Sequence, residues 1–181
     1  MDVRWLGYGV FVTLVVVILG LLAFSTGAIA PLLGDGYHPP DNDSTDASTH
    51  GDYEHTTVTV LDGETGSELG SVEAAIADTF STRYLGLSAT ESLPTDRGML
   101  FVHDSPGEYT YVMREMSFGI DIVFIDANGT ITTIHEAPKP APDEDGNDHR
   151  YTGHGQYVLE VNKGWMADHG VSPGDTVAFE L

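Results

Sequence analysis

The chain has 181 residues, of which 28 are Asp or Glu and only 7 are Lys or Arg, so its formal net charge is -21 at pH 7. It contains no cysteine, which excludes disulfides, thiolate metal sites, cysteine nucleophiles and a thiol-linked lipid anchor. A surface this negative repels nucleic acid, so we expect no nucleic-acid partner.

The acidic composition is typical of a halophilic protein. Asp is more frequent than Glu, Lys occurs only twice, and the acids are spread along the chain. At molar salt the screening length falls to about 3 Å, so repulsion between carboxylates becomes tolerable. Each surface acid is therefore weak evidence for a functional site, although a cation-binding surface is the functional alternative.

Residues 1–34 are predicted to form an N-terminal membrane anchor. No charged residue lies between Trp5 and Gly34. The span, about residues 5–24, is long enough to cross a hydrocarbon layer of roughly 30 Å as a helix. A cleaved signal peptide is the alternative, because Ala-Ile-Ala at 28–30 has the form of a cleavage site. Arg4 before the span favours a cytoplasmic amino terminus. We therefore expect a single-pass protein of the cell membrane, with its soluble domain outside the cytoplasm.

Residues 35–55 are predicted to be a disordered acidic linker, because they are rich in Pro, Gly, Asp, Ser and Thr and lack apolar periodicity. Asn42 in this linker and Asn128 further on each begin a glycosylation sequon. For Asn128 a hairpin turn is the simpler explanation. Residues 56–181 show no internal repeat and are predicted to form a single domain.

The first half of this domain is expected to contain four strands and a short helix. Apolar residues at helical spacing predict a helix over 79–88, capped by Asp78 or Thr79. Pro and Gly within residues 104–108 predict a turn between two strands. The strands are expected at 56–61, 71–77, 98–103 and 109–113.

The second half is expected to begin with a hairpin of residues 120–126 and 130–137 around Asn128 and Gly129. Three prolines predict a loop over 138–155, because proline cannot donate to a sheet. A strand over 156–162, a helical turn capped by Asn162 and ending at Gly170, and a last strand follow. The sequence therefore predicts a mainly β single domain, a small antiparallel or mixed barrel-like sheet with two short helices, preceded by the transmembrane helix.

Three blocks of sequence, residues 82–102, 111–134 and 157–177, occur in an order that resembles the uncharacterised prokaryotic family called domain of unknown function (DUF) family 192. The resemblance covers residues 56–181. It implies a compact, largely β fold with a small barrel-like sheet, and it implies no established activity. The positions that match the family's motifs are Arg83, Gly86, Leu87, Gly98, Met99, Leu100, Phe101, Tyr111, Met113, Arg114, Ile120, Asp121, Ile122 and Asn162.

The chain departs from the family pattern at two places. Val112 stands where the family usually has Trp, and Arg114-Glu115-Met116 stands where Lys-Asn-Thr is common. A site that stacked its ligand on the tryptophan would be altered here, although Tyr111 is adjacent and could partly replace it.

The arginines and Asp121 suggest a ligand site. Asp121 interrupts an apolar strand, and a buried carboxylate needs a partner because burying an unpaired charge costs several kcal/mol. One hypothesis is a cleft in which Arg83 and Arg114 bind an anionic or polyol ligand, Tyr111 and Met113 form an apolar wall, and Asp121 orients the ligand. The structural alternative is a set of arginine–carboxylate clamps that hold the ends of the barrel.

No catalytic motif for a nucleophilic serine, a phosphate-binding loop or a zinc protease is present. Asp143, Asp145 and Asn147 match the start of a calcium loop, but Asp148 and His154 replace the required Gly and Glu. We expect no metal and no cofactor. The favoured function is a binding or accessory module for a small polar ligand or an envelope component. The alternative is a hydrolase or transferase that uses Asp121, with His135 or another acid, near Arg83 and Arg114.

Overall fold

The computed structural model describes residues 52–181. The predicted membrane span, the sequon at Asn42 and nearly all of the predicted linker lie outside the described residues. Residues 52–181 contain no helix with the length and hydrophobicity that a membrane span requires.

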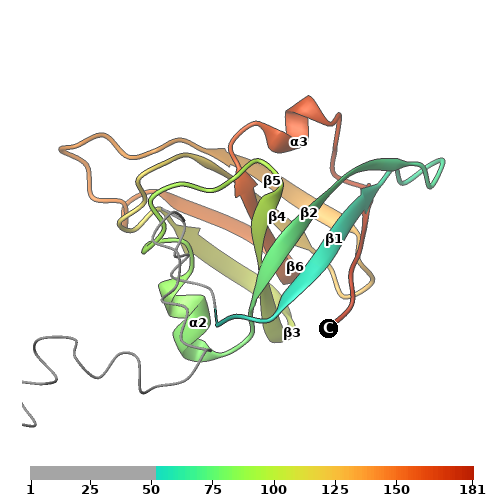
Figure 1. Ribbon diagram of the computed structural model, residues 1–181, viewed down its shortest axis with the longest axis horizontal. Coiled ribbons are helices and arrows are strands. Elements are labelled where there is room, and N and C mark those ends of the chain that lie inside the picture. Colours follow the sequence, from blue (N-terminus) through green and yellow to red (C-terminus); the bar gives the residue numbers. More distant parts are fainter. Residues whose placement is uncertain (1–51) are drawn as a thin grey trace, which may run out of the picture. The chain divides into compact units, whose positions relative to one another are not determined.

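One curled sheet of seven strands forms the domain (Figure 1). Its order is β5-β4-β6-β3-β2-β1-β7, and only the β2–β3 pair is parallel. Strand β7 also bonds to the turn before β5, where the Val177 amide donates to the Gly129 carbonyl over 2.7 Å. The strands are β1 (His55–Leu61), β2 (Glu68–Ala77), β3 (Arg97–Val112), β4 (Ile120–Ile125), β5 (Ile131–Ala137), β6 (Arg150–Asn162) and β7 (Thr176–Ala178).

Residues 52–181 contain two short helices, α2 (Phe80–Leu85) and α3 (Trp165–Asp168). The mainly β, mixed barrel-like fold with two short helices is therefore confirmed. The opening hairpin of β1 and β2 and the hairpin of β4 and β5 are confirmed as well. Thr79 caps α2 through a reciprocal pair of bonds with Thr82, as the sequence predicted.

Apolar side chains form two clusters, one on each face of the central strands. The first cluster contains Val123 of β4 and Leu159 of β6. The second contains the adjacent residues Ile122 and Val158, because successive side chains of a strand point to opposite faces. Residues Val158 to Val161 of β6 are all buried. A polar side chain within this run of four residues therefore lies inside the protein, on whichever face it points to.

The predicted turn at 104–108 is wrong, because β3 runs through it as one strand of 16 residues. Between the pairs Val102–Tyr157 and Gly107–Gly155, β3 advances five residues while β6 advances two. The three additional residues form a bulge, which bends a strand without ending it. The long partner β6 continues on both sides of the bulge, so pairing overrides the local turn signal.

The predicted loop over 138–155 is wrong in its last part, because β6 already begins at Arg150. Gly153 and Gly155 favour a loop in the sequence, but in the sheet they allow close packing. A Cβ atom at Gly153 would lie 2.4 Å from the ring of Phe124, and one at Gly155 would lie 2.6 Å from the carbonyl oxygen of Ile125.

The prediction that Asn162 caps the last helical turn is also wrong. The residue at the start of α3 is Gly164, which has a left-handed conformation. The side-chain amide of Asn162 instead donates to the backbone carbonyls of Leu93 and Pro94. The free amides of this turn are bound by Asp121 of β4, which is remote in the sequence. Its carboxylate accepts from the amides of Gly164 and Met166, each over 2.9 Å.

Candidate ligand-binding pocket

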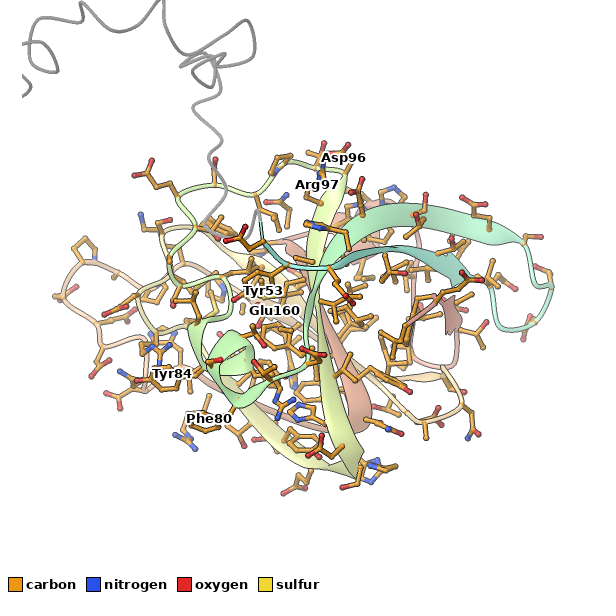
Figure 2. The ribbon with its side chains drawn as sticks, turned by 60° about the horizontal axis from the view of Figure 1, so that its bottom comes forward. Tyr53, Phe80, Tyr84, Asp96, Arg97 and Glu160 are labelled. Atoms are coloured by element: carbon orange, nitrogen blue, oxygen red, sulfur yellow. The ribbon has the colours of Figure 1, made fainter. Side chains whose placement is uncertain are left out.

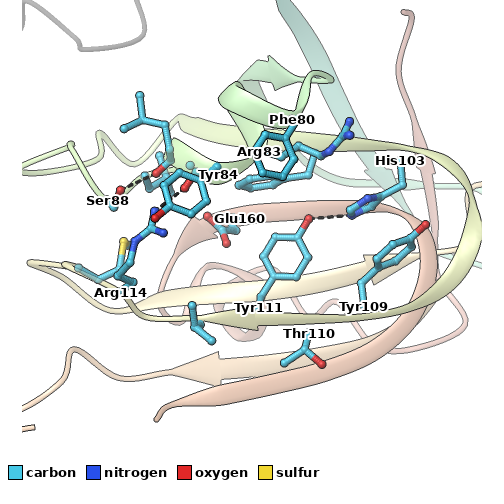
Figure 3. Close-up of a pocket in the computed structure, with 16 residues that line it drawn as sticks. Phe80, Arg83, Tyr84, Ser88, His103, Tyr109, Thr110, Tyr111, Arg114 and Glu160 are labelled. Carbon is cyan, nitrogen blue, oxygen red and sulfur yellow. Dashed lines mark hydrogen bonds between the residues drawn. The ribbon is translucent and has the colours of Figure 1, made fainter. Parts of the chain in front are cut away.

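A pocket of about 410 Å³ lies beside the bent β3 strand (Figure 3). One wall is formed by Phe80 and residues 83–88, which belong to α2 and the segment after it. Residues 109–112 of β3 form another, with Phe101 and His103 from the first half of the same strand. Arg114, Met116 and Glu160 complete the lining. The bulge in β3 therefore has a consequence for the site, because both halves of the strand contribute to one pocket.

The helix α2 is held over the pocket by two arginines. Arg83 Nη1 donates to the carbonyls of Asp78 and Val102, the latter over 2.7 Å. Arg114 Nη2 donates to the carbonyl of Tyr84, and its guanidinium lies 4.0 Å from the centre of the Tyr84 ring. Neither arginine forms an ion pair with a carboxylate among residues 52–181. The predicted arginine–carboxylate clamps are therefore wrong for these two residues, since their partners are backbone carbonyls.

Two aromatic side chains of α2 are unusually exposed. Phe80 is 81% exposed and Tyr84 is 65% exposed, and their rings stack with centroids 6.2 Å apart. Both line the pocket, and both lie on the side of the helix away from Glu160 (Figure 2). They form the rim of the pocket.

Glu160 is the most unusual residue of the pocket. It lies in the middle of β6, between Met99 of β3 and Ile122 of β4, and it is 5% exposed. Its side chain forms no hydrogen bond and no ion pair within the described part of the chain. Burial raises the pKa of this carboxyl to about 8. Near neutral pH Glu160 is therefore mostly a neutral carboxylic acid, which has one O–H donor as well as acceptor oxygens.

Tyr111 and His103 form the second polar group of the pocket. The Tyr111 hydroxyl lies 3.0 Å from His103 Nε2, and the His103 ring stacks on Tyr109 with centroids 3.6 Å apart. Burial raises the pKa of Tyr111, and the nearby Glu160 carboxylate raises it further. Burial also lowers the pKa of His103, with a second contribution from Arg83. Both rings are thus uncharged near neutral pH.

The structure brings together three of the five residues that the sequence proposed for the site. Arg83, Tyr111 and Arg114 all line the pocket. Met113 does not, because it is fully buried in the second apolar cluster. Asp121 is also fully buried, and by alternation along β4 it points to the opposite face from Ile122, the residue that pairs with Glu160.

The environment of Asp121 is structural. Burial raises its pKa, and the bonds from the amides of Gly164 and Met166 oppose that effect. His135, proposed as a catalytic partner, instead lies 2.9 Å from the carbonyl of Thr152 through its Nε2 atom. Neither Asp121 nor His135, the two residues named for the hydrolase hypothesis, lines the pocket.

The motif residues of the first block, residues 82–102, shape the pocket. Gly86 ends α2 with φ of 51°, a conformation that favours glycine, and a Cβ atom there would lie 3.4 Å from the Phe101 ring. A Cβ atom at Gly98 would lie 2.9 Å from the carbonyl oxygen of Glu160, so this glycine permits close pairing of β3 and β6. Met99 and Phe101 are buried in the second apolar cluster.

Sequence reasoning missed Glu160, His103 and Tyr109. Glu160 stands in the run Val-Leu-Glu-Val, in which a lone acid in an alternating strand normally faces solvent. The signal that could have found it is the nearly continuous apolar run of residues 157–161, which is typical of a strand buried on both faces. No group of three or more His, Asp or Glu residues within 52–181 is placed to hold a metal ion.

The fold and the pocket define a small curled β domain with a buried acid in an aromatic pocket. Residues 62–179 match the family DUF192, described as "Uncharacterized ACR", and the chain belongs to this family. No curated protein matches it.

Two solved structures are similar to this chain. A putative transcription regulator from Sinorhizobium meliloti 1021 is 28% identical, with a TM-score of 0.63, over 70% of this chain and 95% of that one. A protein of unknown function from Novosphingobium aromaticivorans DSM 12444 is 25% identical, with a TM-score of 0.57, over 83% of this chain and 96% of that one.

Proposed function

We propose that this domain is a binding module for a small polar ligand, which occupies the pocket between α2, β3 and β6. The observation that carries the proposal is Glu160, a buried carboxyl that faces a pocket and has no hydrogen-bond partner among residues 52–181. A buried polar group left unsatisfied costs roughly 1–3 kcal/mol, so proteins rarely keep one without a use. A ligand with a hydroxyl or amide group would provide the missing partner.

The surroundings of Glu160 support binding better than catalysis. Aromatic rings line the pocket, and few but well-placed polar groups are typical of ligand sites. Tyr111 and His103 already bond to each other, so neither is positioned by a neighbouring acid as a nucleophile or base would be. The pocket therefore presents fixed hydrogen-bonding groups and no assembled catalytic group.

We further propose that the domain acts outside the cytoplasm, tethered to the membrane by residues 5–24. The uncharged segment between Trp5 and Gly34 and the lone Arg4 before it support this placement. Its ligand would then be a component of the cell envelope or a solute taken from the medium. The net charge of -21 supports a function without nucleic acid, and it suits a medium of high salt.

A ligand screen on the full chain tests the binding proposal. Pools of small polar metabolites are added, and the melting temperature is measured for the wild type, Glu160→Leu and Glu108→Leu. Glu108 is exposed on β3 and does not line the pocket, so it is the matched control. A ligand of the pocket stabilises the wild type and the control but not Glu160→Leu, because binding to the folded state raises its stability. If no pool discriminates Glu160→Leu from the control, the proposal is wrong.

A further inference from the structure

The pocket differs in charge from the rest of the protein. The whole chain has 28 acids against 7 Lys and Arg, whereas the pocket is lined by two arginines and a single acid, Glu160. Since Glu160 is mostly protonated near neutral pH, the lining has a net positive charge there. A positive pocket in a strongly acidic protein is unexpected from composition, and it favours an anion over a cation.

Both arginines retain donors that could bind an anion. A guanidinium has five N–H groups in a planar fork. Arg83 uses only Nη1 for its bonds to backbone carbonyls, and Arg114 uses only Nη2. These bonds fix the position of each guanidinium, and within residues 52–181 its remaining N–H groups have no hydrogen-bond partner. A fixed planar donor suits a carboxylate or a phosphate group.

Glu160 lies between the two polar ends of the pocket. In Figure 3 it lies between Arg114 on one side and Tyr111 on the other, and all three line the same pocket. A protonated carboxyl both donates and accepts, so it complements a hydroxyl group, which does the same. An ammonium group only donates hydrogen bonds, so it would use only the acceptor oxygen of the neutral carboxyl. It would also lie near two guanidiniums, which disfavour it by like-charge repulsion.

Resting on the proposed function, we propose that the ligand is a small polyhydroxylated anion, such as a sugar acid or a sugar phosphate. Its anionic group binds the free N–H groups of Arg83 or Arg114, and a hydroxyl group binds the Glu160 carboxyl. The aromatic rings contact its carbon skeleton. The pocket of about 410 Å³ lies within the range of roughly 300–1,000 Å³ that small-molecule sites occupy.

Calorimetric titration of the full chain with four related probes tests this inference near pH 7. The probes are gluconate, glucose 6-phosphate, the neutral sorbitol and the cationic glucosamine. We expect the anions to bind at least about tenfold more tightly than sorbitol, because a charge-assisted hydrogen bond discriminates by this factor or more. Glucosamine is expected to bind weakest. Comparison of the two anions distinguishes a carboxylate ligand from a phosphate ligand.

Two sets of variants assign the contacts. Arg114→Gln is expected to weaken gluconate binding about tenfold and to leave sorbitol binding within about twofold, whereas the exposed Arg150→Gln, outside the pocket, changes neither. Arg114→Lys keeps the charge and gives an intermediate affinity. Glu160→Gln keeps a neutral donor and acceptor and therefore retains binding, while Glu160→Leu loses it.

The relative affinities of the four probes are measured on the wild-type protein. This comparison therefore still tests the inference if an arginine variant does not fold. The inference is wrong if glucosamine binds at least as tightly as gluconate, or if none of the four probes binds. It is also wrong if Arg114→Gln and Arg83→Gln both keep the preference for anions. If these titrations contradict the anionic ligand, the proposed binding function still holds provided that the metabolite screen finds a compound that stabilises Glu108→Leu but not Glu160→Leu. When that screen also fails, both proposals are wrong.

Discussion

The substitution Glu160→Gln is expected to stabilise the folded protein, and the gain should increase with pH. The carboxyl has an ordinary pKa of 4.5 in the unfolded chain and a pKa of about 8 in the fold. Below pH 4.5 it is protonated in both states and adds no pH dependence. Between 4.5 and 8 only the folded state keeps the proton, so each pH unit reduces the free energy of unfolding by about 1.4 kcal/mol.

The magnitude follows from these two values. Their difference corresponds to a penalty of up to about 5 kcal/mol at alkaline pH, which levels off above pH 8. The glutamine side chain has a similar shape and no charge, so the variant avoids the penalty. Between about pH 6 and pH 9 its advantage over the wild type should grow by about 3 kcal/mol, or roughly 10 °C in melting temperature for a domain of this size.

Urea denaturation at several pH values measures this difference, since the change in midpoint at constant slope gives the change in stability. The exposed Glu108→Gln is the matched control and should show the pH dependence of the wild type. If the Glu160→Gln curve parallels the wild-type curve over the whole range, the carboxyl is already ionised or hydrated in the fold. The reasoning about a neutral buried acid would then be refuted.

Three further changes test other parts of the structure. Asp121→Asn should lower the free energy of unfolding by roughly 2–4 kcal/mol without changing ligand affinity in the remaining folded protein, because one amide of Gly164 or Met166 loses its acceptor; an unchanged melting temperature would contradict this role. Gly153→Ala should cost roughly 1–3 kcal/mol in a urea titration, because its Cβ would overlap the Phe124 ring, and a neutral result would show that β6 shifts freely. Raising KCl from about 0.1 M to about 2 M should raise the melting temperature by several degrees, because the screening length falls from about 10 Å to about 3 Å or less and the net charge of -21 repels itself less; a lower melting temperature would contradict the halophilic interpretation.

The sequence determined the local features that depend on neighbouring residues. Thr79 caps α2 because its side chain reaches the amide of Thr82, and this bond needs no other part of the chain. Likewise, Asp126 accepts from the amides of Asn128 and Thr130 in the hairpin turn. Arg83, Tyr111 and Arg114 were found as site residues because they lie in motifs that the sequence displays, and the family followed from the same motifs.

The tertiary structure alone decided what depends on strand pairing. The long β6 strand carries β3 through a sequence that favours a turn, and close packing against Phe124 keeps Gly153 within a strand. The partner of Asp121 also emerged only there, since the carboxylate binds amides more than 40 residues further along the chain. Glu160 is the clearest case. From the sequence, a lone acid in an alternating strand is expected to be exposed. In the structure, β3 and β4 flank β6 on both sides, and α2 lies over the pocket that Glu160 faces. Glu160 is buried by residues that are remote in the sequence. Its neutral state, and its proposed hydrogen bond to a ligand, depend on that burial.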